Sequence, residues 1–157
     1  MYSKDYNKVK VTMKIYIING PNLHLLGVRE PHLYGYTTYL DLVTKLTDYA
    51  AAEDIEAVIY QSNHEGDLVD KISEAYFEKA DGIILNPAAY THTSIALLDA
   101  LKAVGIPTVE VHISDLSQRE DFRQISYVRE ACFATISGHG TDGYFEAIEL
   151  LKNKLKG

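Results

Sequence analysis

The chain has 157 residues, a net charge of −7 and one cysteine, Cys132. This length suits one domain with a full core, and a single cysteine excludes an intrachain disulfide framework and the usual cysteine-based metal sites. The acidic balance excludes general nucleic-acid binding, while the lack of a long apolar run or apolar leader excludes a membrane span and favours a cytoplasmic protein.

Residues 1–12 are polar and aperiodic, which predicts a frayed extension before a single domain at 13–157. From residue 14 onwards, short apolar or β-branched runs alternate with helical repeats. The predicted strands are Ile15–Ile18, Ala57–Tyr60, Gly82–Leu85, Thr108–Val111 and Ala134–Ser137. The predicted helical faces are Leu40-Val43-Leu46-Thr47-Ala50, Leu68-Ile72-Ala75-Tyr76, Ile95-Leu98-Leu101 and Tyr144-Ala147-Ile148-Leu151-Leu155. This alternation predicts an α/β fold, a flavodoxin-like three-layer α/β/α sandwich with a five-stranded parallel sheet.

Helix boundaries agree with this pattern. Thr37 or Thr38 can cap the first helix, Gly105 with Pro107 ends the third, and Thr141 or Asp142 can cap the last.

The connection after the first strand, 19–35, is much longer than the roughly 2 to 6 residues usual in α/β wiring. It carries an amide, a guanidinium and a phenol: Asn22, Arg29 and Tyr34. Its four leucines, Leu23, Leu25, Leu26 and Leu33, argue against disorder and favour a loop that folds over a pocket.

Ligands of open α/β sheets bind outside the carboxyl ends of the strands, and polar residues follow four of the predicted strands there. They are Asn22, Arg29 and Tyr34, then Gln61, Ser62 and Asn63, then Asn86 and Thr91 to Ser94, and finally Glu110, His112, Ser114, Arg119 and Arg123.

The alternation in Val109–Ser114 points Glu110, His112 and Ser114 the same way. A solvated polar face is one interpretation. The other is a Glu110–His112 pair in which the carboxylate fixes the ring tautomer and raises its basicity; a central strand covered on both faces favours it.

The remaining polar residues each have an ordinary structural explanation. Thr91 or Thr93 can cap a helix whose free N–H groups can also bind an anion. Asp99 can be a solvated helix charge, Tyr34 one of many packing tyrosines, and Arg119 and Arg123 can form surface pairs with Glu120 or Asp121.

Taken together, the segments resemble one family. They are Ile18-Asn-Gly-Pro-Asn-Leu-His-Leu-Leu-Gly27, Arg29-Glu-Pro31, Tyr34-Gly35, Gln61-Ser-Asn63, Asn86-Pro87, Tyr90-Thr-His-Thr-Ser94, Glu110-Val-His-Ile-Ser114 and Arg119-Glu-Asp-Phe-Arg123. Their order and spacing from Lys14 to about Leu155 are similar to those of type II 3-dehydroquinate dehydratase.

The resemblance implies a cofactor-free and metal-free lyase of the shikimate or quinate pathway that converts 3-dehydroquinate to 3-dehydroshikimate. It implies that Tyr34 is the base, activated by Arg29 and Arg119, that Asn22 holds a water at the enolate oxygen, and that His112, paired with Glu110, is the acid.

The resemblance also implies the substrate contacts and the assembly. Asn86 and the backbone of Ile113 and Ser114 would hold the carboxylate, and His92 and Arg123 the ring hydroxyls. Asp99 would reach the neighbouring subunit's site in a homo-oligomer, a dodecamer built from trimers.

Two residues depart from the family pattern: His24 replaces a usual Asn, and Ala88 a usual Gly that matters if the position needs positive φ. Two other protein classes share the predicted topology. A flavin- or nucleotide-binding module would need a Gly-rich first loop, and a phospho-receiver domain would need acidic residues after the first strand, where Asn19 and Asn22 stand.

Overall fold

The computed structural model describes residues 12–28, 30–34 and 36–157, apart from the side chain of Tyr34. One parallel sheet has the order β2-β1-β3-β4-β5. Its strands are β1 (Met13–Asn19), β2 (Ile55–Gln61), β3 (Gly82–Asn86), β4 (Thr108–His112) and β5 (Ala134–Ser137). The five predicted strands are therefore confirmed.

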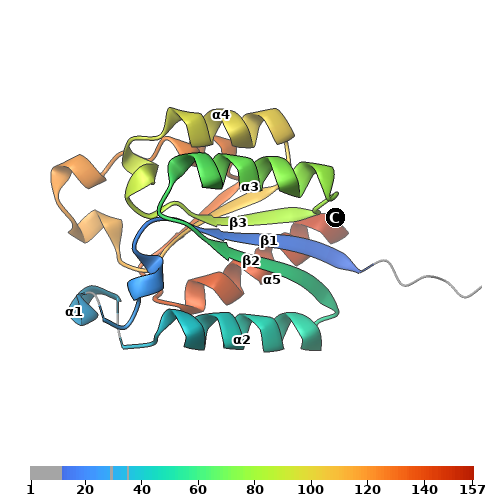
Figure 1. Ribbon diagram of the computed structural model, residues 1–157, viewed down its shortest axis with the longest axis horizontal. Helices are drawn as coiled ribbons and strands as arrows, with labels where there is room; N and C mark the ends of the chain where they lie inside the picture. The colour runs from blue at the N-terminus through green and yellow to red at the C-terminus, as the bar shows by residue number, and fades with distance from the viewer. Residues whose placement is uncertain (1–11, 29, 35) are drawn as a thin grey trace, which may run out of the picture.

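Helices cover both faces of the sheet, which confirms the three-layer α/β/α prediction (Figure 1). The long helices are α2 (Tyr39–Ala52), α3 (Glu65–Phe77), α4 (Ile95–Val104) and α5 (Asp142–Lys156). In Figure 1, α3 and α4 lie on one side and α2 and α5 on the other. Residues of β1 alternate between the layers: Ile15 and Ile17 join the core of α2 and α5, while Tyr16 and Ile18 join that of α3 and α4. Burial on both faces explains why the three inner strands, β1, β3 and β4, are largely apolar.

Five residues assigned to apolar helix faces in the sequence are exposed: Leu40, Thr47, Tyr76, Ile95 and Leu155. Leu40 in α2 is 73% exposed and Ile95 in α4 is 55% exposed, whereas Leu42 and Leu97 are buried. Because each helical residue turns by 100°, positions two apart point about 200° away from each other. The buried stripe therefore begins two residues later than predicted in α2 and α4.

Helix ends follow capping chemistry. Thr38 caps α2 in a reciprocal box with Asp41, and Gly105 ends α4 in the left-handed conformation. Thr141 occupies the cap position of α5 without a side-chain cap hydrogen bond. The cap of α4 is Ser94, whose Oγ accepts from the Leu97 amide at 2.9 Å, so neither Thr91 nor Thr93 serves there.

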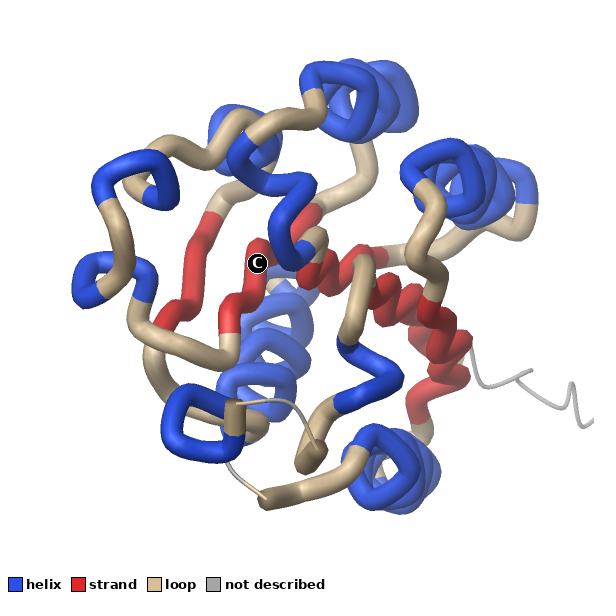
Figure 2. The backbone as a smooth tube through the Cα atoms, turned by 60° about the vertical axis from the view of Figure 1, so that its left-hand side comes forward, coloured by secondary structure: helices blue, strands red, loops and turns tan. Residues whose placement is uncertain are grey.

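Several short helices lie beyond the carboxyl ends of the strands. They are α1 (Pro31–Tyr34) and the 3₁₀ helices η1 (Leu23–Leu25), η2 (Ala88–His92), η3 (Leu116–Gln118), η4 (Asp121–Arg123) and η5 (Val128–Ala131). Figures 1 and 2 show the segments after β1 and after β4 projecting past the same end of the sheet. In the segment after β1, Leu23 and Leu26 are buried as expected, whereas Leu25 is 41% exposed. None of the helices in the described part of the chain is long and apolar enough to span a bilayer.

Candidate active site

A small cavity, open to solvent, lies at the carboxyl edge of the sheet between the segments that follow β1, β3 and β4. Its lining comprises Pro21, Asn22, Ala88, Ala89, His92, His112, Ile113, Ser114, Leu116, Arg119 and Arg123. Ligands of open α/β sheets bind at this edge, where the candidate residues were expected from the sequence.

Seven of the predicted site residues line this cavity: Asn22, His92, His112, Ile113, Ser114, Arg119 and Arg123. Asn86, Asp99 and Glu110 do not line it; Asn86 and Glu110 are buried, and Asp99 is exposed on α4. Arg29 and the side chain of Tyr34 lie outside the described residues, and the backbone of Tyr34 ends α1.

The turn that carries Asn22 is fixed by the segment after β2. The Asn63 Oδ1 atom accepts from the Asn22 amide at 3.0 Å, and Gln61 Nε2 donates to the Gly20 carbonyl at 3.1 Å. Gly20 also packs so tightly against the segment after β3 that a Cβ there would lie 2.4 Å from the Pro87 carbonyl oxygen. The Gln61 and Asn63 side chains therefore position the first loop.

A buried polar relay anchors the turn after β3. The Asn86 Oδ1 atom accepts from the Ala88 amide at 3.1 Å, while Asn86 Nδ2 donates to the Tyr144 hydroxyl at 2.9 Å. That hydroxyl donates in turn to Asn19 Oδ1 at 2.6 Å. Asn86 thus holds the turn to the sheet and to α5, and one hydrogen of its amide nitrogen is bonded to Tyr144.

Ala88 itself adopts a left-handed conformation, with φ 51°. A side chain with a Cβ is strained there by about 1 kcal/mol or more, whereas glycine is not. The departure noted in the sequence therefore falls on a position that favours glycine, in the cavity wall.

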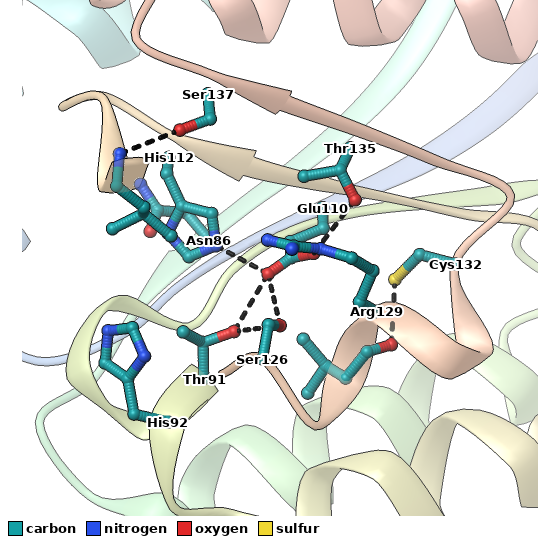
Figure 3. Close-up of polar contacts among 12 residues, drawn as sticks. Asn86, Thr91, His92, Glu110, His112, Ser126, Arg129, Cys132, Thr135 and Ser137 are labelled. Carbon is teal, nitrogen blue, oxygen red and sulfur yellow. Dashed lines mark hydrogen bonds and ion pairs between the residues drawn. The ribbon is translucent and has the colours of Figure 1, made fainter. Parts of the chain in front are cut away.

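His112 and Glu110 form a close buried pair. The ring nitrogen Nε2 of His112 lies 2.6 Å from Glu110 Oε1, and Glu110 is fully buried while His112 is 5% exposed (Figure 3). No described residue bonds the other ring nitrogen of His112. This nitrogen is therefore available to a ligand in the cavity that His112 lines. The paired interpretation of this strand is confirmed, and the solvated-face interpretation is wrong.

Glu110 is ionised in the folded protein. Burial by itself would raise the pKa of its carboxyl, but hydrogen bonding and charge from His112, with support from Ser126 and Arg129, hold that pKa well below the usual range. The buried carboxylate can therefore compensate a positive charge on the adjacent imidazole.

The second histidine in the cavity is His92. His92 Nδ1 lies 2.7 Å from the Ile125 carbonyl, an acceptor, so Nδ1 carries the proton and Nε2 offers a lone pair. Burial lowers the pKa of His92, and the positive charges of His112 and Arg123 act in the same direction. His92 is a neutral hydrogen-bond acceptor, suited to a ligand hydroxyl.

The part of the cavity lined by Ile113, Ser114, Arg119 and Arg123 suits an anion. Arg119 donates to Ser114 Oγ at 3.1 Å, and Glu120 pairs with Arg123 at 2.8 Å and Arg119 at 3.6 Å. Among the loop hydrogen bonds of the described residues, the amides of Ile113 and Ser114 donate to no backbone carbonyl. Two guanidiniums and two backbone donors therefore surround this end of the cavity.

Sequence reasoning missed the residues that support this arrangement. Ser126, Arg129 and Thr135 all donate to Glu110, and Tyr144 bonds Asn86. They lie on segments far along the chain from their partners and fit no motif. Of the supporting residues, Thr91, Gln61 and Asn63 gave a signal, because they stand in segments of the family pattern.

Residues 13–152 match the family described as dehydroquinase class II. A 3-dehydroquinate dehydratase from Caldicellulosiruptor bescii is 51% identical over 142 residues, which is 90% of this chain and 98% of the relative. One from Rhodopseudomonas palustris is 52% identical over 141 residues, covering 90% of this chain and 93% of the relative.

A solved structure agrees with these matches. The crystal structure of type II dehydroquinase from Butyrivibrio crossotus superimposes with a TM-score of 0.89 at 50% identity, covering 90% of this chain and 98% of that one.

Proposed function

Because this chain belongs to the class II dehydroquinase family, we propose that the cavity at the carboxyl edge of its sheet is the active site for dehydrating 3-dehydroquinate. The chain is a 3-dehydroquinate dehydratase of the shikimate or quinate type, which removes water from 3-dehydroquinate to give 3-dehydroshikimate. The observation that carries the assignment to this cavity is the buried Glu110–His112 pair in its wall.

The reaction needs three groups. A base removes the C2 proton beside the ketone, a donor stabilises the enolate oxygen, and an acid protonates the departing C1 hydroxyl as the C1–C2 double bond forms. The acid's proton and the C1 hydroxyl leave together as one water. The base then holds the proton taken from C2, and returning a proton from the base to the acid restores the starting state.

We assign the acid to His112. Its proton passes to the C1 hydroxyl while Glu110 compensates the imidazolium from behind. Because the Glu110 carboxylate is fully buried and held by neutral and cationic donors, it keeps the ring in one orientation.

The base in the proposal is Tyr34. An ordinary phenol with a pKa near 10 is only about one-thousandth ionised at neutral pH, so a base of this kind needs a cation beside it. Arg29 and Arg119 are the proposed cations. Asn22 lines the cavity and is proposed to hold a water against the enolate oxygen.

The carboxylate of the substrate is proposed to sit between the backbone amides of Ile113 and Ser114, with Arg119 nearby. Asn86 belongs to this set by resemblance: its Nδ2 atom carries two hydrogens, one of which bonds the Tyr144 hydroxyl, and the other is proposed to bind the substrate. His92 and Arg123 are proposed to bind the ring hydroxyls, with His92 as the acceptor.

The test is a direct assay. Purified protein mixed with 3-dehydroquinate is expected to build up enone absorbance. Tyr34→Phe and His112→Ala are each expected to lower kcat by about 10² to 10⁴, since general acid–base groups contribute that much. Unchanged activity in either variant would contradict the mechanism.

We further propose a trimer-based dodecamer, in the cytoplasm, in which Asp99 reaches the neighbouring subunit's site. Asp99 is exposed on α4 and lines no part of its own chain's cavity, as a contribution to a neighbour requires. Size-exclusion chromatography with light scattering distinguishes a dodecamer from the trimer or the single chain.

A further inference from the structure

Glu110 is the centre of a hydrogen-bond cluster that extends well beyond His112 (Figure 3). Its Oε1 atom accepts from His112 at 2.6 Å, Ser126 at 2.6 Å and Thr91 at 2.9 Å. Its Oε2 atom accepts from Thr135 at 3.0 Å and from Arg129 Nε at 3.1 Å. These donors come from four different segments of the chain and converge on one carboxylate.

Arg129 differs from the other three supporting donors because it is charged. It lies on η5, its side chain is 46% exposed, and it lines a second cavity together with Thr135 and Ser137. Arg129 is absent from the lining of the cavity that holds His112. A direct contact with the substrate is therefore not its role.

The two oxygens of Glu110 thus bond an imidazole and a guanidinium. His112 bonds Oε1, while Arg129, which stays protonated at any working pH, bonds Oε2. A positive charge near a carboxylate weakens the attraction that the same carboxylate exerts on a second cation. The Arg129 charge is partly screened because its side chain is half exposed.

Other ionisable groups near this pair are few among the described residues. His92 on η2 interacts electrostatically with both Glu110 and His112, but it is mainly neutral at pH 7. The positive charge of Arg123 on η4 lowers the pKa of His92. The Cys132 thiol, directly after η5, also interacts electrostatically with Glu110, and burial raises the pKa of that thiol to about 12, so it carries no charge. Arg129 is therefore the charge that opposes His112 at this carboxylate.

We propose that Arg129 is a positioning residue for the dehydration, holding Oε2 of Glu110 so that Oε1 aligns the His112 ring without binding its proton too strongly. An acid transfers its proton best when it holds it near the working pH. Without Arg129, the whole charge of Glu110 would act on the imidazolium. This inference rests on the proposed role of His112 as the acid.

The test is the pH dependence of kcat in Arg129→Gln, which removes the charge and keeps a hydrogen-bond donor. His112 must be protonated to act, so activity falls as the pH rises. Losing Arg129 should keep the ring protonated to higher pH. The alkaline limb is expected to move up by about half to one pH unit, less than the one to three units of an unscreened neighbouring charge, with kcat at its maximum several-fold lower and KM within about twofold.

Two further variants make the result specific. Arg129→Lys keeps the charge and is expected to return the limb close to its wild-type position. Lys102→Gln removes an exposed ion pair of 2.9 Å between Lys102 on α4 and Glu130, the neighbour of Arg129 on η5. This pair does not involve Glu110, so the variant is expected to leave the pH profile unchanged. If Arg129→Gln does not fold, as judged by circular dichroism, Arg129→Met is measured instead.

An alkaline limb that stays in place or moves down in the uncharged variant would overturn the inference, even if the variant is less stable. Failure of the proposed function looks different. In that case the wild-type protein would not dehydrate 3-dehydroquinate, or His112→Ala would retain its turnover.

Discussion

At the scale of the residue, Ala88 shows that a site can tolerate local strain. It lies in the cavity wall at φ 51°, held there by the hydrogen bond from its amide to Asn86. The left-handed region costs a residue with a Cβ about 1 to 2 kcal/mol. The two packed segments around Gly20 and Pro87 impose this turn on whatever residue stands at position 88.

Replacing Ala88 with glycine is therefore expected to stabilise the protein. The relief of strain is partly offset by the greater freedom of glycine in the unfolded chain, which leaves a gain of about 0.5 to 1 kcal/mol in the free energy of unfolding. Urea denaturation measures it. Ala89→Gly, at the next position and without positive φ, is the matched control and should lower stability. A loss of stability in Ala88→Gly would show that the turn does not strain its alanine.

A second prediction at this scale concerns how Glu110 makes the free energy of unfolding depend on pH. Its folded pKa lies below the value in the unfolded chain, so its stabilising contribution is complete above the unfolded value near 4.3 and is lost as the pH falls below it. By pH 3 the loss should amount to about 1 to 2 kcal/mol.

The measurement is the free energy of unfolding between pH 6 and pH 3. The wild-type value should fall more steeply than that of Glu110→Gln, which has no carboxyl to protonate. Asp70→Asn, a substitution at an exposed position on α3, should retain the wild-type slope. Equal slopes for wild type and Glu110→Gln would mean that Glu110 is not the group that titrates.

At the scale of the element, the start of α2 determines how the long first connection enters the fold. Thr38 Oγ1 accepts from the Asp41 amide at 3.1 Å, and Asp41 Oδ2 accepts from the Thr38 amide at 3.1 Å. This box satisfies two backbone donors at the point where the loop becomes a helix. Its effect is local, because Thr38 itself is exposed.

Thr38→Ala is expected to lower the free energy of unfolding by about 1 kcal/mol, the usual loss for a helix cap. Thermal denaturation followed by circular dichroism measures it. Thr44→Ala is the control within the same helix: Thr44 bonds the Leu40 carbonyl from an exposed position, and alanine there should be neutral or stabilising. Equal effects of the two substitutions would remove the special role of the cap.

At the scale of the whole molecule, the prediction concerns sites shared between subunits. If Asp99 completes a neighbour's site, chains carrying Asp99→Ala and chains carrying Tyr34→Phe should each be inactive. A mixed assembly should regain activity, because about one quarter of its sites would combine an intact Tyr34 with an intact Asp99 from the adjacent chain. Each variant unfolded and reassembled alone is the control. No recovery in a verified mixed assembly would place Asp99 outside the neighbour's site.

The elements differed in how far the sequence could determine them. All five strands were predicted, and β1, β3 and β4 gave the clearest apolar runs because their residues are buried on both faces of the sheet. The buried faces of α2 and α4 were wrong at their first residue, because Leu40 and Ile95 are apolar but exposed, whereas Leu46 and Leu98 are buried as predicted. A pattern of apolar residues does not show which of them meets the sheet.

By itself, the sequence determined the alternation of strands and helices, the edge of the sheet where the cavity lies, and the pairing of Glu110 with His112, because these follow from local periodicity and parallel connection rules. Only the tertiary structure showed that Ser126, Thr135 and Arg129 surround Glu110, that Asn86 is bonded to Tyr144, and that Ala88 is strained. These contacts join segments distant in the sequence, and such contacts leave no periodic trace because they depend on how separate elements pack.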